Sequence, residues 1–174
     1  GFRESDGREV FAYVPQSVFG KMHQLASPTY QHQFFVDGPM VESDAYINAP
    51  YKSSAGSSVR WANLVLGTTG AGARSVFALD VTWPTSMSER SILWEINNKQ
   101  SGMGDIGNVM SEVQSGITAS GDWVAIFGNG PYGASGQAKL MIVNLATGAL
   151  IKSIGTDSST ANGLGGVRLV RDNT

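Results

Sequence analysis

The sequence predicts an all-β protein, namely a partial β-propeller built from antiparallel four-stranded blades. Short apolar runs alternate with turn residues, and glycine fills 22 of the 174 positions, which suits short strands joined by tight turns. Charged residues make up only 15% of the chain, fewer than the solvated faces of a helical bundle need. One order of strands and turns also occurs twice, about 60 residues apart, as expected for propeller blades.

The first 32 residues are predicted to end one blade and to link it to the next. Gly1–Arg3 and Val10–Val14 are strand-like and flank the turn signal Asp6-Gly7, so a hairpin is expected. A short linker helix is expected over 16–26, because apolar residues recur there at helical spacing. The residues on its predicted apolar face are Val18, Met22 and Leu25.

Residues 33–97 are predicted as one blade, 98–156 as a second, and 157–174 as the start of another. The strands expected in the first are 34–36, 44–47, 61–66, 75–81 and 92–96, with a loop at 48–59. The strands expected after it are 109–118, 122–127, 139–145, 149–154 and 164–170, with a loop at 97–108. An incomplete ring leaves blade faces bare and strand edges unpaired, so the native protein is expected to be longer on both sides.

Three pairs of residues define the repeat. They are Trp61 with Trp123, Gly67 with Gly128, and Asp80 with Asn144, at offsets of 62, 61 and 64 residues. Asp80 and Asn144 are expected to cap turns through their side chains, since both residue types bond readily to nearby backbone amides.

The composition excludes several classes of function. A net charge of −2 without a basic run offers no electrostatic surface for nucleic acid. The absence of cysteine removes thiol nucleophiles, disulfides and cysteine zinc sites. No apolar run approaches the ~20 residues of a membrane-spanning helix.

One motif imitates a nucleotide site. The run from Gly128 to Gly133 matches G-x-G-x-x-G, but a dinucleotide site needs this loop to open a helix. Strand-like residues follow instead, and Pro131 removes one amide donor. A hairpin turn is therefore the favoured interpretation.

The remaining polar candidates point to no catalytic or metal site. The two histidines, His23 and His32, are too few for zinc by themselves and are interpreted as loop or core residues. No EF-hand loop occurs, and Asp105 and Asp157 are interpreted as ordinary loop residues.

The tryptophans of the predicted strands leave two roles open. Trp61, Trp94 and Trp123 can pack between blades, which the repeat of two of them favours, or can stack against sugars.

A series of segments occurs in an order typical of one protein family. They are Phe11–Pro15, Phe35–Gly38, Asp44–Tyr46, Leu66–Thr82, Trp94-Glu95, Trp123–Gly130, Asn144–Gly148 and Asn162–Leu164. Together they resemble the C-terminal, quinoprotein-like β-propeller of the PilY/PilC family of type IV pilus biogenesis proteins and tip adhesins. The likeness covers nearly the whole chain and is more specific than any single motif.

This resemblance implies a non-enzymatic binding module. Its implied roles are pilus extension, surface attachment and twitching motility, and its implied partners are pilin subunits, other pilus assembly proteins or the host-cell surface. The implied location is the periplasm, outer membrane surface or pilus tip of a Gram-negative bacterium. Many members carry a calcium loop after the Asn162–Leu164 motif, but Arg171 stands here where the first acidic ligand belongs. A cation repels calcium, so no metal site is expected. The resemblance implies no catalytic residue, and no cofactor is expected.

Two alternatives stay open. A quinone-dependent dehydrogenase uses similar glycine-rich repeats, but it needs calcium held by carboxylates and an aspartate base, and no acidic cluster is visible in the sequence. A generic periplasmic scaffold propeller has no sequence feature that separates it from a pilus protein.

Overall fold

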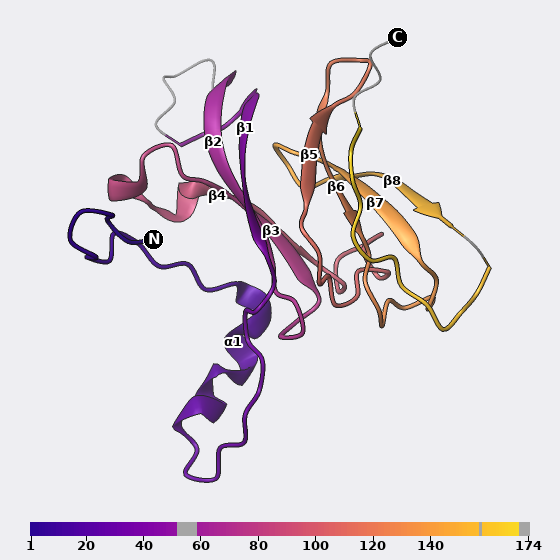
Figure 1. The fold of residues 1–174 in the computed structure, drawn as a ribbon, viewed down its shortest axis with the longest axis horizontal. Coiled ribbons are helices and arrows are strands. Elements are labelled where there is room, and N and C mark those ends of the chain that lie inside the picture. Colours follow the sequence, from indigo (N-terminus) through magenta and orange to yellow (C-terminus); the bar gives the residue numbers. More distant parts are fainter. Residues whose placement is uncertain (52–58, 157, 171–174) are drawn as a thin grey trace.

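The computed structural model describes residues 1–51, 59–156 and 158–170. It contains two four-stranded antiparallel sheets that pack face to face, as Figure 1 shows. Each sheet is a meander, with the orders β1-β2-β3-β4 and β5-β6-β7-β8. This is the architecture of neighbouring propeller blades, so the predicted fold class is confirmed. The blade boundaries at residues 32, 97 and 156 stay a prediction.

The first sheet consists of β1 (Met40–Asn48), β2 (Val59–Thr68), β3 (Ser75–Asp80) and β4 (Ile92–Asn97). The strand predicted at 34–36 is wrong. The backbone there packs against the β2–β3 turn instead of a strand edge, so closely that a Cβ on Gly72 would lie 1.8 Å from the carbonyl oxygen of Phe35. Of the loop predicted at 48–59, residues 52–58 lie outside the described residues, and its two end residues belong to β1 and β2.

The second sheet consists of β5 (Gln114–Ile117), β6 (Trp123–Gly128), β7 (Lys139–Asn144) and β8 (Leu150–Gly155). The strand predicted at 109–118 is shorter than expected, because Val109 and Val113 fill the core between the sheets instead of pairing. The strand predicted at 164–170 does not form. The backbone of Leu164 bonds to the glycine-rich turn, where Gly130 N donates to its oxygen at 2.9 Å.

The N-terminal segment crosses the free face of the first sheet. Its predicted hairpin is reduced to one bridge between Phe2 and Glu9, and the strand predicted at 10–14 is wrong. The Tyr13 ring packs on Phe77 of β3 at a centroid distance of 5.0 Å, so this segment lies on the sheet and not beside an edge strand.

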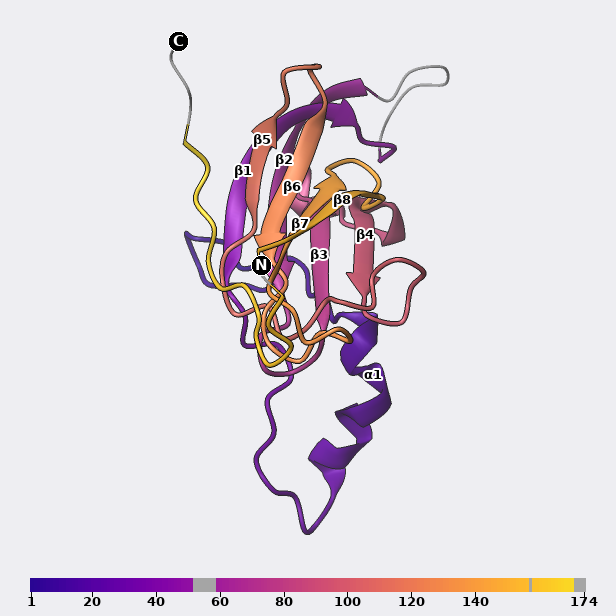
Figure 2. The same ribbon diagram turned by 90° about the vertical axis from the view of Figure 1, so that its right-hand side faces the viewer.

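The predicted helix is present as α1 (Gln16–Met22) and the 3₁₀ turn η1 (His23–Ala26). Only Val18 of its expected apolar face is buried, while Met22 and Leu25 are exposed. Figures 1 and 2 show α1, η1 and the returning chain projecting as an arm beyond the end of both sheets. Two further 3₁₀ turns, η2 (Pro84–Ser86) and η3 (Glu89–Ser91), lead from β3 to β4. No helix among the described residues has the length and apolar character needed to cross a bilayer.

One core lies between the two sheets. It combines small side chains of β1, large aliphatic side chains of β2 and aromatic side chains of β4 and β6. Its members include Ala45, Leu64, Leu66, Trp94, Ile106, Phe127 and Met141. Ile106 comes from the loop at 97–108, so part of that loop is core and not surface.

The structure corrects the repeat register. Asp80 pairs with Leu64, and Asn144 pairs with Val124, so β2 and β6 correspond at an offset of 60 residues. Trp123 therefore corresponds to Asn63 and Gly128 to Thr68, so the predicted matches with Trp61 and Gly67 are wrong by two residues and by one residue. The offset is smaller before the turn between the two middle strands than after it, because this turn is longer in the second sheet. Both sheets also carry a register shift at matching points, between Ala78 and Leu79 and between Ile142 and Val143.

Candidate functional site

The glycine-rich run from Gly128 to Gly133 is the turn between β6 and β7, and no helix follows it. Asn129 is fully buried at its start. Its Oδ1 accepts from Lys139 N at 2.8 Å and Leu164 N at 3.0 Å, and its Nδ2 donates to Gln137 O at 2.9 Å. The backbone amides of Asn129 and Gly130 donate to Lys139 O and Leu164 O, so the loop binds other parts of the fold through both its backbone and its Asn129 side chain.

Asp105 has a structural role that sequence reasoning missed. Its carboxylate accepts from Lys139 Nζ at 2.5 Å and from Ser135 N at 2.8 Å, which ties the entry loop of the second sheet to the β6–β7 turn. Partial burial opposes ionisation, but the hydrogen bonds from Lys139 and Ser135 hold the pKa of Asp105 below its usual range. Asp157 lies outside the described residues.

Asp80 and Asn144 cap turns, as predicted. Asp80 Oδ1 accepts from Thr82 N at 3.1 Å, and Asn144 Oδ1 accepts from Ala146 N at 3.0 Å. Asp80 also forms a buried ion pair with Arg60, whose guanidinium lies over the Trp83 ring at 4.4 Å. The sequence pattern does not show this pair, because its partners meet only across β2 and β3.

The histidines lie apart from any such network. His23 and His32 are exposed in the arm, and His32 makes an edge contact with Phe34 at 5.1 Å. Within the described ranges, no group of three or more His, Cys, Asp or Glu side chains is placed to hold a metal ion. Arg171 and the residues that follow it, at the place where many family members carry a calcium loop, fall outside those ranges.

The arm is anchored to the first sheet at its root. Glu95 of β4 accepts from Gln16 N at 2.7 Å and Ser17 N at 2.9 Å, and so caps the first turn of α1 from outside the helix. Lys21 adds a second link, since its ammonium donates to Phe34 O at 2.6 Å and to Gly72 O. Burial lowers the pKa of Lys21, and nearby Asp37 opposes that shift.

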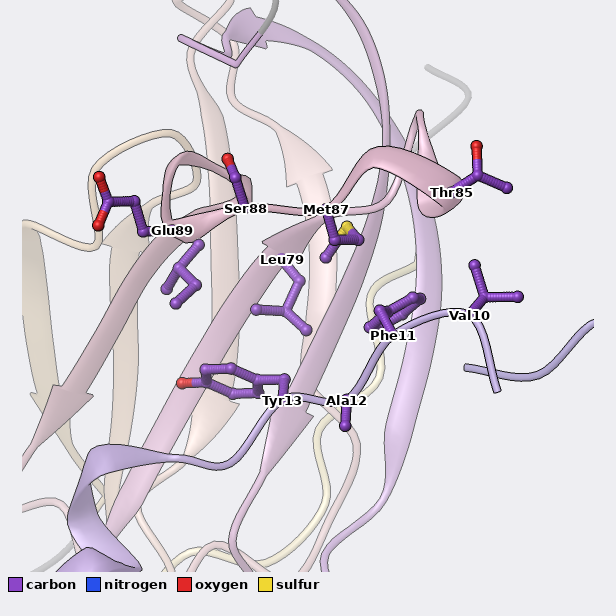
Figure 3. A pocket seen from close by; sticks show the side chains of 10 residues that line it. Val10, Phe11, Ala12, Tyr13, Leu79, Thr85, Met87, Ser88 and Glu89 are labelled. Carbon is purple, nitrogen blue, oxygen red and sulfur yellow. The ribbon is translucent and has the colours of Figure 1, made fainter. Parts of the chain in front are cut away.

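Glu95 also accepts from the hydroxyl of Tyr13 at 2.8 Å. Burial, with this hydrogen bond and the charge of Glu95, raises the pKa of Tyr13. Beside Tyr13 lies a cavity of about 410 Å³, shown in Figure 3, which is lined by Val10 and Phe11 of the N-terminal segment and by Leu79 and Met87. The lining combines apolar side chains with the polar Thr85, Ser88 and Glu89, whose side chains point in different directions in Figure 3.

The three strand tryptophans differ in environment. Trp94 is buried, and its Nε1 donates to Leu145 O in the second sheet at 2.8 Å. Trp123 is partly buried and contacts Trp61 edge-on at 6.0 Å. Packing between blades therefore explains the burial of Trp94 and the partial burial of Trp123. It does not account for Trp61, which remains 63% exposed.

Comparison with known proteins identifies the family. The sequence model of the PilY1 beta-propeller domain matches residues 2–174. A type IV pilus biogenesis factor PilY1 homolog of Xylella fastidiosa is 43% identical over 151 residues, covering 87% of this chain and 9% of the relative. The type IV pilus biogenesis factor PilY1 of Pseudomonas aeruginosa is 35% identical, covering 100% of this chain and 14% of the relative.

A solved structure shows the same fold. The crystal structure of the Pseudomonas aeruginosa PilY1 C-terminal domain matches with a TM-score of 0.76 and 30% identity, over 99% of this chain and 31% of that chain. The chain thus spans about a tenth of the length of the curated relatives and about a third of the solved domain. Its sequence and its fold agree in assigning it to one family, and the chain belongs to the PilY1 β-propeller domain family.

Proposed function

We propose that residues 1–174 form part of a non-enzymatic binding module in a type IV pilus assembly protein, supporting pilus extension, surface attachment and motility. Membership of the PilY1 β-propeller family along nearly the whole chain carries this proposal. The way the polar side chains are used supports it. Asp80, Asp105 and Asn129 each bind groups of the fold itself and so act as supports for loops. No catalytic residue, metal or cofactor is proposed for this segment.

The contact surfaces would lie on the loops and the arm. The rigid sheets hold these segments at fixed positions, and a binding platform needs that property. The arm exposes Phe19, Leu25 and Phe34, and the loop at 97–108 exposes its polar side chains. We expect the partners to be pilin subunits, other assembly proteins or the host-cell surface, in the periplasm, at the outer membrane surface or at the pilus tip.

A deletion of this segment in a piliated Gram-negative bacterium tests the proposal. We expect fewer surface pili in electron micrographs, smaller twitching zones and weaker attachment, with protein levels checked by immunoblot. Unchanged piliation, twitching and attachment would contradict it. The dehydrogenase alternative is tested by dye-linked oxidation of alcohols or sugars, measured on the purified protein with added quinone. Oxidation in this assay would favour an enzyme over a binding module.

A further inference from the structure

Three aromatic side chains form a continuous cluster where the two sheets meet. Tyr46 of β1 and Trp61 of β2 have ring centroids 5.8 Å apart, and Trp61 and Trp123 of β6 are 6.0 Å apart. Tyr46 is 51% exposed and Trp61 is 63% exposed. Because Trp61 contacts the second sheet, it belongs to the junction between the sheets and not to one isolated face.

Packing among the described residues leaves these two rings exposed. Trp94 shows how the fold treats an indole that it uses for packing, with 7% of the residue exposed and the ring nitrogen bonded. An indole left mostly in water keeps a large apolar face available for a ligand.

A polar pair lies beside the aromatic pair. Tyr46 is the cross-strand partner of Trp61, and Asp44 is the cross-strand partner of Asn63. The two pairs are two residues apart along β1 and β2, so they share one face of the sheet at a spacing of about 7 Å. Among the described residues, neither the Asp44 carboxylate nor the Asn63 amide has a side-chain hydrogen bond. Both are exposed.

We propose that Asp44, Tyr46, Trp61 and Asn63 form a binding site for a neutral saccharide. A pyranose ring has an apolar C–H face, which stacks on an indole, and hydroxyl groups at its edge. Those hydroxyls need planar acceptors and donors next to the stacking surface, and the Asp44 and Asn63 side chains supply them. The spacing of the two pairs matches a ligand of one or two sugar rings.

The charges around the site select neutral sugars over acidic ones. Glu42 and Asp44 both project from the same face of β1, and the nearest cation in sequence, Arg60, is bound to Asp80. Among the residues that the structure describes, a sialic acid or uronic acid would meet two carboxylates without a free cation beside them. The saccharide site goes beyond the proposed role in attachment. Only its biological use, binding of the bacterium to a surface, rests on that proposed role.

The test is a glycan array of neutral and sialylated oligosaccharides, followed by equilibrium titration of the purified protein with the strongest neutral binder. We expect Trp61→Ala to weaken binding by about tenfold or more, since the stacking surface is lost. Asp44→Asn should keep binding within about twofold, because the amide oxygen still accepts from a hydroxyl. Asn63→Ala is the second variant and keeps the test decisive if Trp61→Ala folds poorly.

Tyr132→Ala is the matched control. Tyr132 is an equally exposed aromatic residue, 69% accessible, in the separate β6–β7 turn, so its loss should leave saccharide binding unchanged. Binding to sialylated glycans alone, or neutral binding that survives both Trp61→Ala and Asn63→Ala, would overturn the proposal. The absence of binding to neutral saccharides would also overturn the proposal. If Trp61→Ala then lowered attachment to protein-coated surfaces, the site would be a contact for a protein instead. Normal pilus counts in the Trp61→Ala strain distinguish a failure here from a failure of the assembly role.

Discussion

Single side chains fasten the loops of this protein to its sheets, and Asp105 is the clearest case. Its folded pKa lies below the ordinary value of 3.8, so the unfolded chain takes up the proton first as the pH falls. The stabilisation is complete above that value and is lost as the pH falls toward the folded pKa. We therefore expect acid unfolding of the wild type to steepen below about pH 4.

Asp105→Asn should remove that acid dependence. At neutral pH we expect a loss of about 1 kcal/mol or less, because the pair with Lys139 is partly solvated and is screened. Urea unfolding between about pH 7 and pH 2.5 measures both effects. Glu112→Gln is the control, an exposed carboxylate without a described ion pair, and an equal response of both variants would contradict the assignment.

Tyr13 makes the stability of the fold depend on pH in the alkaline range, in the direction opposite to that of Asp105. Its folded pKa is raised above the ordinary value of 10.0, so stability is complete below that value and falls as the pH rises above it. Tyr13→Phe removes the ionisable hydroxyl and should flatten this alkaline limb, at the cost of the bond to Glu95 at neutral pH. Thermal unfolding from about pH 8 to pH 11 shows the difference, with Tyr132→Phe as an exposed control. Parallel curves for wild type and Tyr13→Phe would refute the link.

Sequence reasoning succeeds for residues whose partners are close in the chain. The caps at Asp80 and Asn144 follow from turn chemistry within three residues, and both are present. The contacts of Glu95 with Gln16 and of Arg60 with Asp80 join distant segments. They depend on strand register, which a single sequence does not reveal.

The β6–β7 turn is an element whose shape depends on one buried amide. The Asn129 side chain bonds to four backbone groups in three segments of the chain, and removing it leaves these groups without that partner. We expect Asn129→Ala to lower the free energy of unfolding by about 2–4 kcal/mol. Chemical denaturation measures this loss. Asn98→Ala, whose side chain has no hydrogen bond among the described residues, should change stability by about 0.5 kcal/mol or less.

Strand prediction worked where a neighbouring strand was available. The strands predicted at 75–81, 92–96, 122–127 and 139–145 appear as β3, β4, β6 and β7, because apolar runs between tight turns pair with the next run along the chain. The runs at 10–14, 34–36 and 164–170 have the same strand-like composition but find no strand edge. Their backbones pack on a sheet face or against a turn instead. Composition thus predicts extended structure, while tertiary packing decides whether it becomes a sheet.

At the scale of the molecule, the shared core explains why the two sheets form one body. Trp94 of the first sheet donates to Leu145 of the second and rests against Gly148, where a Cβ would lie 2.8 Å from the indole. Any side chain at position 148 would push the sheets apart. The repeat in the sequence predicted two blades, but this contact between them needed the three-dimensional structure.

The outer face of the second sheet is also built for packing. Ile126 and Ile142 pair on the side opposite the core, and Leu140 pairs with Ile154 beside them. These four aliphatic side chains are only partly covered in the described structure. A continuous apolar sheet face of this kind is stable only when another layer covers it. We predict that a further sheet of the same propeller covers it in the full-length polypeptide.

Ile142→Asp tests this prediction, because a carboxylate placed under a covering sheet has no partner. We expect the full-length protein to lose several kcal/mol of stability, seen as a large fall in thermal midpoint and soluble yield. Ile151→Asp is the matched control. Ile151 lies on the same edge region but is more than half exposed, at the register shift of β8, so the charge there should cost little. If both variants unfold at the wild-type temperature, the outer face is open to solvent in the whole protein, and the division of this chain into neighbouring blades is wrong.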